Sequence, residues 1–172
     1  MSIFDSTNFE RQGNTDNDIK LDNINDTRKC ILKLSGSALR SIKIFTPDMQ
    51  TELYNTDDFR KSLLDFSRGN RHAKIQILAT DTTDAAHQGH QLIRLAQQTP
   101  SVIQIRNTPQ DYQALNFAFL LIDQSEFVFK RTDPDSTPLH SSCTHRINRL
   151  LEFFTTAWEQ AEKDPHTRQF LI

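Results

Sequence analysis

Three short segments of the chain alternate apolar and polar residues with a period of two, the pattern of a strand with one buried face. They cover residues 41–45, 74–79 and 101–106. Pro47 and Pro109 follow the first and the third segment closely, and a proline does not continue a strand. We therefore predict three strands at these positions.

Between these segments, apolar residues recur at three- and four-residue spacing, the period of an amphipathic helix. The first such pattern begins at Asp26 or Thr27, either of which is a suitable N-cap. The second covers residues 57–69, with two aspartates at its start and a glycine at its end. The third covers residues 81–98 and includes His90 among the positions expected to be buried. We predict one helix for each pattern.

The last third of the chain changes character. Residues 116–122 are mostly apolar, as expected of a strand buried on both faces. A tight turn at 123–125 and a strand at 126–131 would complete a hairpin. A loop rich in Pro and Ser covers 132–142, and a long amphipathic helix covers about 144–163. The order of elements predicts an α/β sandwich with a mixed sheet of about five or more strands, parallel among the first three.

Composition divides the 172-residue chain into two parts. Residues 1–26 hold six acids and two bases and few large apolar residues, so we predict a disordered acidic leader. Residues 27–172 then form a single domain. The two cysteines cannot build a disulfide framework, no apolar run is long enough to span a membrane, and the start lacks the pattern of a secretory signal. A cytoplasmic protein is the expectation.

The sequence offers few groups that carry chemistry. It contains no phosphate-binding glycine loop, no dinucleotide fingerprint and no nucleophile elbow. His87 and His90 would share one face of a helix, but a third metal ligand is missing at a suitable spacing. Cys143 lies between His140 and His145, where a base so close along the backbone is rarely well aimed. We predict neither a metal site nor a cofactor.

A family resemblance adds to this interpretation. The order of elements over about 27–165 resembles one repeat of the phospholipase D-like superfamily, in which a central strand carries His-x-Lys-x4-Asp and a Phe-to-Trp helix closes the unit. Here residues 116–123 occupy that strand and turn, and 150–159 resemble the closing helix. The run from Ser41 to Ile172, which includes Asp164-Pro165-His166-Thr167-Arg168, is more closely similar to an uncharacterised proteobacterial domain of this fold. That domain stands alone or follows an acetyltransferase domain.

Carried over residue by residue, the family's catalytic motif is incomplete. The histidine falls on Asn116 and the lysine on Ala118, and only Asp123 matches. The histidine is needed to attack phosphorus, and the lysine to stabilise charge on the phosphoryl oxygens. The resemblance therefore implies a domain without this phosphodiesterase activity and with no catalytic residues. Because single-repeat members pair, it also implies a homodimer, and it leaves an acetyltransferase as one conceivable partner.

A degenerate site of this kind could still bind a ligand. Crevices outside the carboxyl ends of parallel strands are where α/β folds place ligands, and an arginine there could hold a phosphate or a carboxylate. The candidate binding residues are Thr80, Asp81, Arg106, Asn116 and Asp123. Asp123 has an equally good explanation as a turn residue that hydrogen-bonds its own backbone.

Three functions remain open from the sequence. The leading hypothesis is a non-catalytic module that binds a ligand or a partner protein. The second is nucleic-acid binding, although the nearly neutral charge of residues 27–172 argues against it. A contiguous basic face would favour it, made of Arg60, Lys61, Arg68, Arg71 and Lys74. The third is a hydrolase or transferase with a non-standard site, which requires groups such as Asp81, His90 or Asp123 to meet in one cleft.

Overall fold

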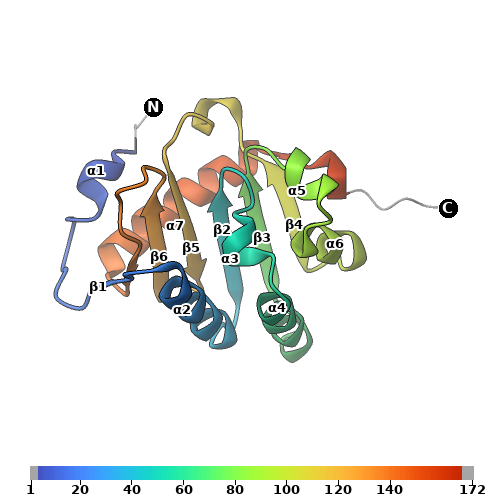
Figure 1. Ribbon diagram of the computed structural model, residues 1–172, viewed down its shortest axis with the longest axis horizontal. Helices are drawn as coiled ribbons and strands as arrows, with labels where there is room; N and C mark the ends of the chain where they lie inside the picture. Colours follow the sequence, from blue (N-terminus) through green and yellow to red (C-terminus); the bar gives the residue numbers. More distant parts are fainter. Residues whose placement is uncertain (1–3, 168–172) are drawn as a thin grey trace.

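The computed structural model describes residues 4–167 and places one mixed β-sheet between two layers of helices (Figure 1). Within these residues the strand order is β1-β7-β6-β5-β2-β3-β4-β8. The strands are β1 Ile19–Lys20, β2 Ser41–Thr46, β3 Lys74–Ala79, β4 Ile103–Asn107, β5 Phe117–Ile122, β6 Glu126–Arg131, β7 Leu139–Ser141 and β8 Glu162–Lys163. β2, β3 and β4 are parallel neighbours, and the remaining pairs are antiparallel.

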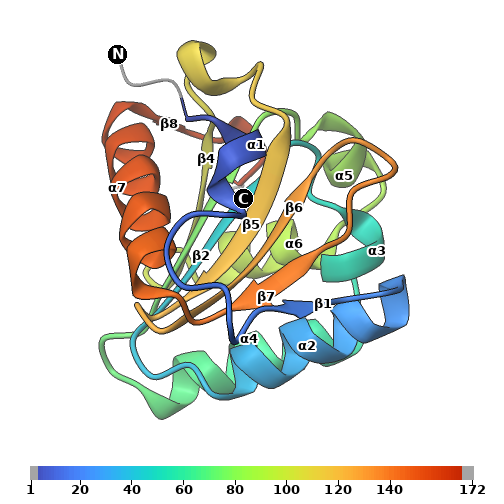
Figure 2. The ribbon, with the colours of Figure 1, turned by 90° about the vertical axis from the view of Figure 1, so that its left-hand side faces the viewer.

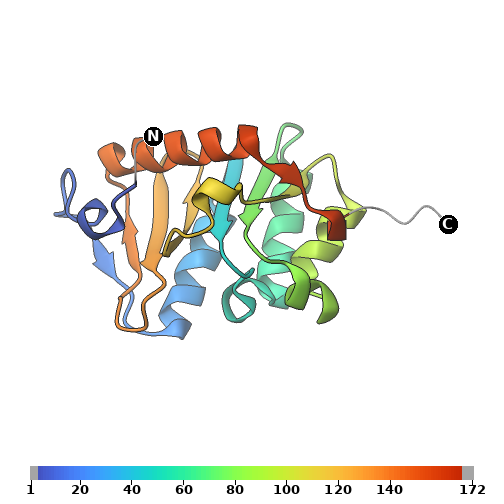
Figure 3. The same cartoon turned by 90° about the horizontal axis from the view of Figure 1, so that it is seen from above.

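The helices cover the two faces of the sheet unequally. They are α1 Ser6–Phe9, α2 Ile24–Gly36, α3 Thr51–Tyr54, α4 Asp57–Gly69, α5 Thr83–His87, α6 Gln91–Gln98 and α7 Thr144–Gln160, with short 3₁₀ turns η1 Gln110–Tyr112 and η2 Pro165–Thr167. α2, α4 and α6 lie on one face, and α7 crosses the other (Figure 3). Of the helices described, none is long and apolar enough to cross a membrane.

Alternation along the strands builds two separate cores. Ile44 and Ile77 point into the core beneath α2, α4 and α6, which consists mainly of aliphatic residues. Phe45 and Leu78, one residue further along each strand, point into the core beneath α7. That second core is largely aromatic, and Phe154 of α7 lies at its centre with no exposed surface. The period-two pattern of the sequence is thus divided between two helix layers.

Much of the predicted architecture is confirmed. The strands predicted at 41–45, 74–79 and 126–131 match β2, β3 and β6 closely. The strand predicted at 116–122 is β5, and it is buried on both faces. The parallel arrangement of the first three predicted strands and the β5–β6 hairpin are also found. The fold class is therefore the mixed α/β sandwich that the sequence indicates.

The helix predicted over 81–98 is two helices. Gly89 has a φ of +69°, a left-handed conformation that ends α5. His90 then caps α6, because its Nδ1 accepts a hydrogen bond from the Leu92 N–H at 3.2 Å. His87 is exposed whereas His90 is fully buried, so the two imidazoles do not share a helix face. Within residues 4–167 there is no group of three or more His, Cys, Asp or Glu side chains that could hold a metal ion.

The described part of the predicted leader, residues 4–26, packs against the rest of the chain. Phe9 has no exposed surface and packs on Phe129 at 4.5 Å between ring centroids, and α1 lies beside β5 and β6 (Figure 2). The fully buried Arg146 of α7 binds Asp18 at 2.6 Å. A few aromatic side chains and one buried cation are enough to order this acidic segment. Residues 1–3 of the leader and 168–172 of the predicted domain lie outside the described residues.

Three strands were missed because they are short, and one of them, β1, lies within the predicted leader. β7 lies inside the loop predicted over 132–142 and pairs with β6. The closing helix ends at Gln160 rather than near Lys163, and β8 follows it as an antiparallel edge strand beside β4. Strands of two or three residues have no measurable period, so sequence pattern does not reveal them.

Candidate functional site

The position that the resemblance assigns to a catalytic lysine is closed. Ala118 of β5 is buried, and a cavity of about 20 Å³ lies beside it. Tyr54 of α3, Ile31 of α2 and Lys130 of β6 line this cavity. A cavity of that size holds about one water molecule. Neither a lysine side chain nor a phosphodiester fits there without displacing the residues of α2 and α3.

The position that the resemblance assigns to a catalytic histidine is occupied by the chain itself. The Asn116 Oδ1 accepts a hydrogen bond from the Ser6 hydroxyl at 3.0 Å. Next to it, Phe4 packs on Phe117 with 4.7 Å between ring centroids. The N-terminal segment therefore lies against the beginning of β5. An amide that accepts an internal hydrogen bond supplies no nucleophile.

Three of the five predicted binding residues share one edge of the sheet. Thr80 and Asp81 follow β3, and Asn116 precedes the antiparallel β5, so all three lie beyond the carboxyl ends of the parallel strands. The Asp81 N–H donates to the Pro47 carbonyl at 2.9 Å. Its carboxylate accepts from the Thr83 N–H at 2.9 Å, and this hydrogen bond lowers the pKa of Asp81. Asp81 therefore serves the turn into α5.

Arg106 points away from that edge. Its guanidinium lies 4.3 Å from the ring centroid of Trp158 and donates to the Trp158 carbonyl at 2.8 Å. The side chain thus joins β4 to the end of α7 through a cation–π contact and a hydrogen bond. In this conformation Arg106 belongs to the packing of α7 and does not reach the edge that holds Thr80 and Asp81.

Asp123 lies at the opposite edge of the sheet. Seven residues of extended chain separate it from Asn116, a distance of roughly 23 Å. Its carboxylate accepts hydrogen bonds from the backbone N–H groups of Leu39, Arg40 and Ser41 at 2.8–3.4 Å. We expected Asp123 to accept a hydrogen bond within the turn at 123–125. The donors belong instead to the turn before β2. The five predicted residues therefore do not converge on one ligand.

The predicted basic face is dispersed as well. Arg60 lines a hollow between α4 and α6, whereas Lys61 lines a different hollow between α4 and α2. Lys74 lies in β3 with its side chain on the α7 face of the sheet, as its alternation with Leu78 requires. Arg60, Lys61 and Lys74 therefore do not share one surface.

The non-standard catalytic groups considered from the sequence do not meet either. His90 is buried and donates through Nε2 to the Met49 carbonyl at 3.2 Å, while Asp81 and Asp123 lie at opposite edges of the sheet. Cys143 contacts the Gln12 carbonyl at 3.8 Å, and the neighbouring His140 pairs with Glu126 at 3.2 Å. Burial alone would raise the pKa of Cys143, but hydrogen bonds from Arg146 outweigh it and lower that pKa.

One polar cluster was missed by sequence reasoning. The Thr82 hydroxyl donates to Asp164 at 2.6 Å and lies 2.9 Å from the His166 Nδ1. Asp164 also accepts from the His166 N–H at 2.7 Å. These contacts fasten β8 and η2 to the beginning of α5. Because 82 residues separate Thr82 from Asp164, no local motif could have indicated the contact.

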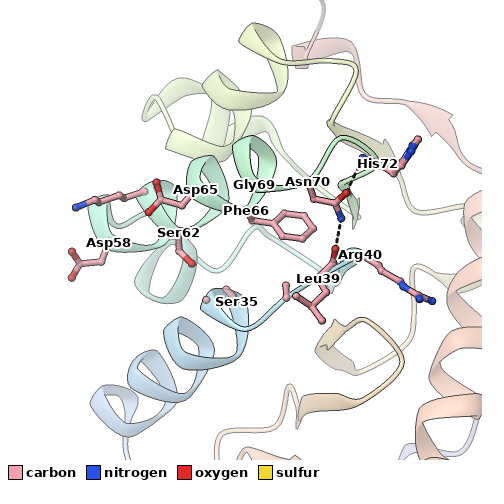
Figure 4. Close-up of a pocket in the computed structure, with 13 residues that line it drawn as sticks. Ser35, Leu39, Arg40, Asp58, Ser62, Asp65, Phe66, Gly69, Asn70 and His72 are labelled. Carbon is pink, nitrogen blue, oxygen red and sulfur yellow. Dashed lines mark hydrogen bonds between the residues drawn. The ribbon is translucent and has the colours of Figure 1, made fainter.

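The largest hollow described lies between α2 and α4 (Figure 4). It has a volume of about 900 Å³ and lies between the carboxyl-terminal end of α2 and the length of α4 from Asp58 to Gly69. Phe66 and Leu39 give it apolar walls, and Leu39 is 73% exposed. No candidate from the sequence pointed here, although an isolated leucine in the turn after a helix was a weak signal.

The walls of the hollow carry both signs of charge. Asp58, Lys61 and Asp65 come from α4, and Arg40 and His72 come from the two adjoining turns. Asn70 ties these turns together, because its side chain donates to the Leu39 carbonyl and accepts from the His72 N–H (Figure 4). The hollow is therefore an amphipathic groove between fixed turns.

Comparison with known proteins agrees with this fold. The family model for the Domain of unknown function (DUF7931) matches residues 23–170. No curated protein matches the sequence. Among solved structures, Nuc of Salmonella typhimurium, a phospholipase D family member, is 14% identical with a TM-score of 0.57, over 80% of this chain and 90% of that one. NucT from Helicobacter pylori is 15% identical with a TM-score of 0.60, over 86% of this chain and 97% of that one.

A third neighbour is larger. TrmBL2, an archaeal chromatin protein described as showing a novel mode of DNA binding, is 18% identical with a TM-score of 0.62. The match covers 86% of this chain and 54% of that one, so the chain spans about half the length of TrmBL2. Because the sequence identities are only 14–18%, the three structures show that this chain shares their fold and nothing more.

Proposed function

The chain belongs to the family described as the Domain of unknown function (DUF7931), and we propose that this member, with its phospholipase D-like fold, is a binding module without phosphodiesterase activity. The observation that supports the proposal is the closed space around β5. Ala118 faces a cavity of about 20 Å³, and Asn116 is hydrogen-bonded to Ser6. The reactive groups are missing at both positions, and beside Ala118 the room for a substrate is missing as well.

We place the binding site in the hollow between α2 and α4. Leu39 is the most exposed large apolar residue described and lies next to Phe66. Exposed apolar surface bordered by charge is typical of sites that bind protein segments. The occupant we propose is a short peptide segment of a partner protein, with one bulky apolar side chain between Leu39 and Phe66 and charges of both signs on either side.

Selection from a random peptide library tests this site. We expect peptides enriched on the wild-type protein to carry a bulky apolar residue flanked by charged residues. Their binding should fall by more than tenfold on Leu39→Asp, because a carboxylate replaces the apolar wall, as isothermal titration calorimetry would measure. A tenfold loss corresponds to about 1.4 kcal/mol.

Ile24 provides a matched control for this substitution. It is also an exposed large apolar residue, but it begins α2, at the end far from the hollow. Ile24→Asp adds the same charge at a helix N-terminus, where an acid is tolerated, and should leave peptide binding unchanged. Peptides that bind Leu39→Asp as well as they bind the wild type, or no enrichment at all, would place binding elsewhere.

Association with nucleic acid is a second candidate. TrmBL2, which shares the fold, is described as binding DNA. The five basic residues named from the sequence do not supply the surface, because Arg60 and Lys61 line different hollows. This candidate therefore needs another cationic surface.

Cellular setting and assembly complete the proposal. Cys30 and Cys143 are free thiols, which suits the reducing cytoplasm of a bacterium. The resemblance to single-repeat phospholipase D-like proteins supports a homodimer, and the resemblance to acetyltransferase fusions makes such an enzyme the first partner to test. Light scattering coupled to size exclusion would report a mass of either 19.9 kDa or twice that value.

A further inference from the structure

The α7 face of the sheet is covered only in part. α7 runs obliquely behind the sheet in Figure 1, and its Trp158 reaches Arg106 at the carboxyl end of β4. The aromatic core under α7 includes Phe45 and Leu78 but nothing nearer the beginning of β2 and β3. Both faces of a parallel sheet are normally covered by helices. The amino-terminal parts of β2, β3 and β4 are an exception on this face.

Polar side chains stand in register on this uncovered part. Lys43 is paired with Gln76, and Gln76 with Gln104, so the three form one row across three parallel strands. Lys74 lies one row below, and Arg106 and Lys163 are paired one row above. Directly paired residues share a face of the sheet. The basic strip is defined as Lys43, Lys74, Gln76, Gln104, Arg106 and Lys163.

The strip carries four cations and no carboxylate of its own. Asp123 is the acid that faces Lys43, and its oxygens already accept three backbone N–H groups. Lys74 and Lys163 are exposed, while Lys43 is half-buried. Burial lowers the pKa of Lys43, Asp123 opposes this effect, and the neighbouring Lys74 adds to it. The positive charge of the strip is therefore only weakly compensated.

The polar groups of the strip also lack partners. Among residues 4–167, the side chains of Lys43, Lys74, Gln76, Gln104 and Lys163 form no hydrogen bond or ion pair. The half-buried Lys43 ammonium and Gln76 amide would gain from an anionic acceptor, because it would offset their desolvation. Two residues along a strand span about 6.6 Å, and two strand spacings span about 9.6 Å. The strip is thus wide enough for several phosphate groups in a line.

We propose that the basic strip binds the phosphate backbone of a nucleic acid. Lysine, arginine and glutamine are the side chains that contact phosphates in such complexes. A protein partner would need apolar anchors at the centre of its interface, and the strip has none. The strip has no aromatic side chain for base stacking and no element that could enter a DNA groove. We therefore expect it to bind nucleic acid through charge, without preference for a sequence. The proposal is independent of the peptide site between α2 and α4.

Fluorescence anisotropy with a short labelled DNA duplex tests the proposal in the full-length protein. Arg106 is held by Trp158, so the three lysines of the strip remain for phosphates. If each lysine neutralises one phosphate, the logarithm of affinity should fall against the logarithm of salt concentration with a slope of about −2.7. Lys43→Gln/Lys74→Gln should reduce this slope by about two and weaken binding on the order of tenfold or more at about 0.1 M salt. A duplex of unrelated sequence should bind equally well.

Two exposed lysines of α2 supply the matched control. Lys29 and Lys33 lie on the opposite face of the sheet, and Lys29→Gln/Lys33→Gln removes the same charge. This control should keep the wild-type salt slope, and circular dichroism should show that both double variants are folded. An equal loss of affinity in the two variants would mean that net charge alone drives binding, which overturns the proposal. So would the absence of DNA binding by the wild type at about 50 mM salt.

Discussion

The Asp123 carboxylate accepts hydrogen bonds from three consecutive backbone N–H groups at the entrance to β2. It adopts a left-handed φ of +53° in the turn between β5 and β6, a conformation that Asp tolerates better than most residues. Asp123, the one residue that matched the motif in the resemblance, therefore has a structural role. It joins the hairpin turn to the turn that also forms one wall of the hollow through Leu39 and Arg40.

Replacing Asp123 should show this role as a loss of stability. Asp123→Ala removes an acceptor for three N–H groups and should lower the free energy of unfolding by about 2 kcal/mol. Asp123→Asn keeps one acceptor oxygen and the tolerance for positive φ, so it should cost clearly less. Urea unfolding of the two variants beside the wild type makes the comparison. Equal stability of all three proteins would contradict the structural role.

His90 makes stability depend on pH in a defined direction. Burial lowers the pKa of His90, and its hydrogen bond to the Met49 carbonyl opposes that effect. A proton on the His90 Nδ1 would also remove the hydrogen bond that this atom accepts from the Leu92 N–H. The folded state thus binds this proton less readily than the unfolded state, whose histidine titrates near about 6.5. The contribution to stability is fully present above that pH and is lost as the pH falls below it.

Urea unfolding at pH 7.5 and 5.5 measures this effect. The wild type should lose about 1 kcal/mol more than His90→Asn between these two values. Asparagine is a good N-cap and can still accept from the Leu92 N–H, but it does not titrate. An identical pH dependence of the two proteins would show that His90 is not the group responsible.

At the scale of elements, the N-terminal segment belongs to the aromatic core. Phe9 has no exposed surface, and Phe4 contacts Phe117. Arg146, buried in α7, donates to the backbone carbonyls of Glu10 and Asn14 at 3.2 Å. The segment therefore packs against β5 and β6, and Ser6 donates a hydrogen bond to Asn116 at the beginning of β5.

A single substitution tests whether this segment is packed in solution. Phe9→Ala should lower the free energy of unfolding by about 3 kcal/mol, as for other fully buried phenylalanines. Phe154→Ala, in the same core but from α7, should have a similar effect and is the matched control. A disordered segment would instead give a change within about 0.5 kcal/mol for Phe9→Ala.

Long elements could be predicted from the sequence, and short or distant contacts could not. β2, β3, β6 and α4 follow from periods that extend over six or more residues. β1 and β8 are two residues long and exist only because another strand lies beside them. The break at Gly89 was hidden because a glycine inside a periodic pattern can also be tolerated in a helix.

The candidate site was harder to predict than the fold. The carboxyl ends of the parallel strands attract ligands in open α/β sheets, and that rule suggested Thr80, Asp81 and Arg106. Here η2 and α7 use the same region for packing, through the contacts of Asp164 and Trp158. The hollow between α2 and α4 depends on how two turns meet, which the tertiary contact between Asn70 and Leu39 determines.

At the scale of the whole molecule, the sheet separates three regions with different properties. The helices α2 and α4 enclose an amphipathic hollow on one face. The other face combines an aromatic core under α7 with the uncovered basic strip. At the centre of the sheet, the side of β5 that carries Ala118 has space for only about 20 Å³. On this account, the position beside Ala118 is filled, and the remaining open surfaces are the ones proposed to bind partners.

Hydrolysis of a chromogenic phosphodiester by the purified wild-type protein is the most direct test of this account. We expect no turnover above that of Asn116→Ala, because neither protein has a nucleophile at this position. Asn116→His/Ala118→Lys should also remain inactive, since a lysine does not fit in about 20 Å³. Turnover that co-elutes with the wild-type protein and disappears in Asn116→Ala would contradict the account.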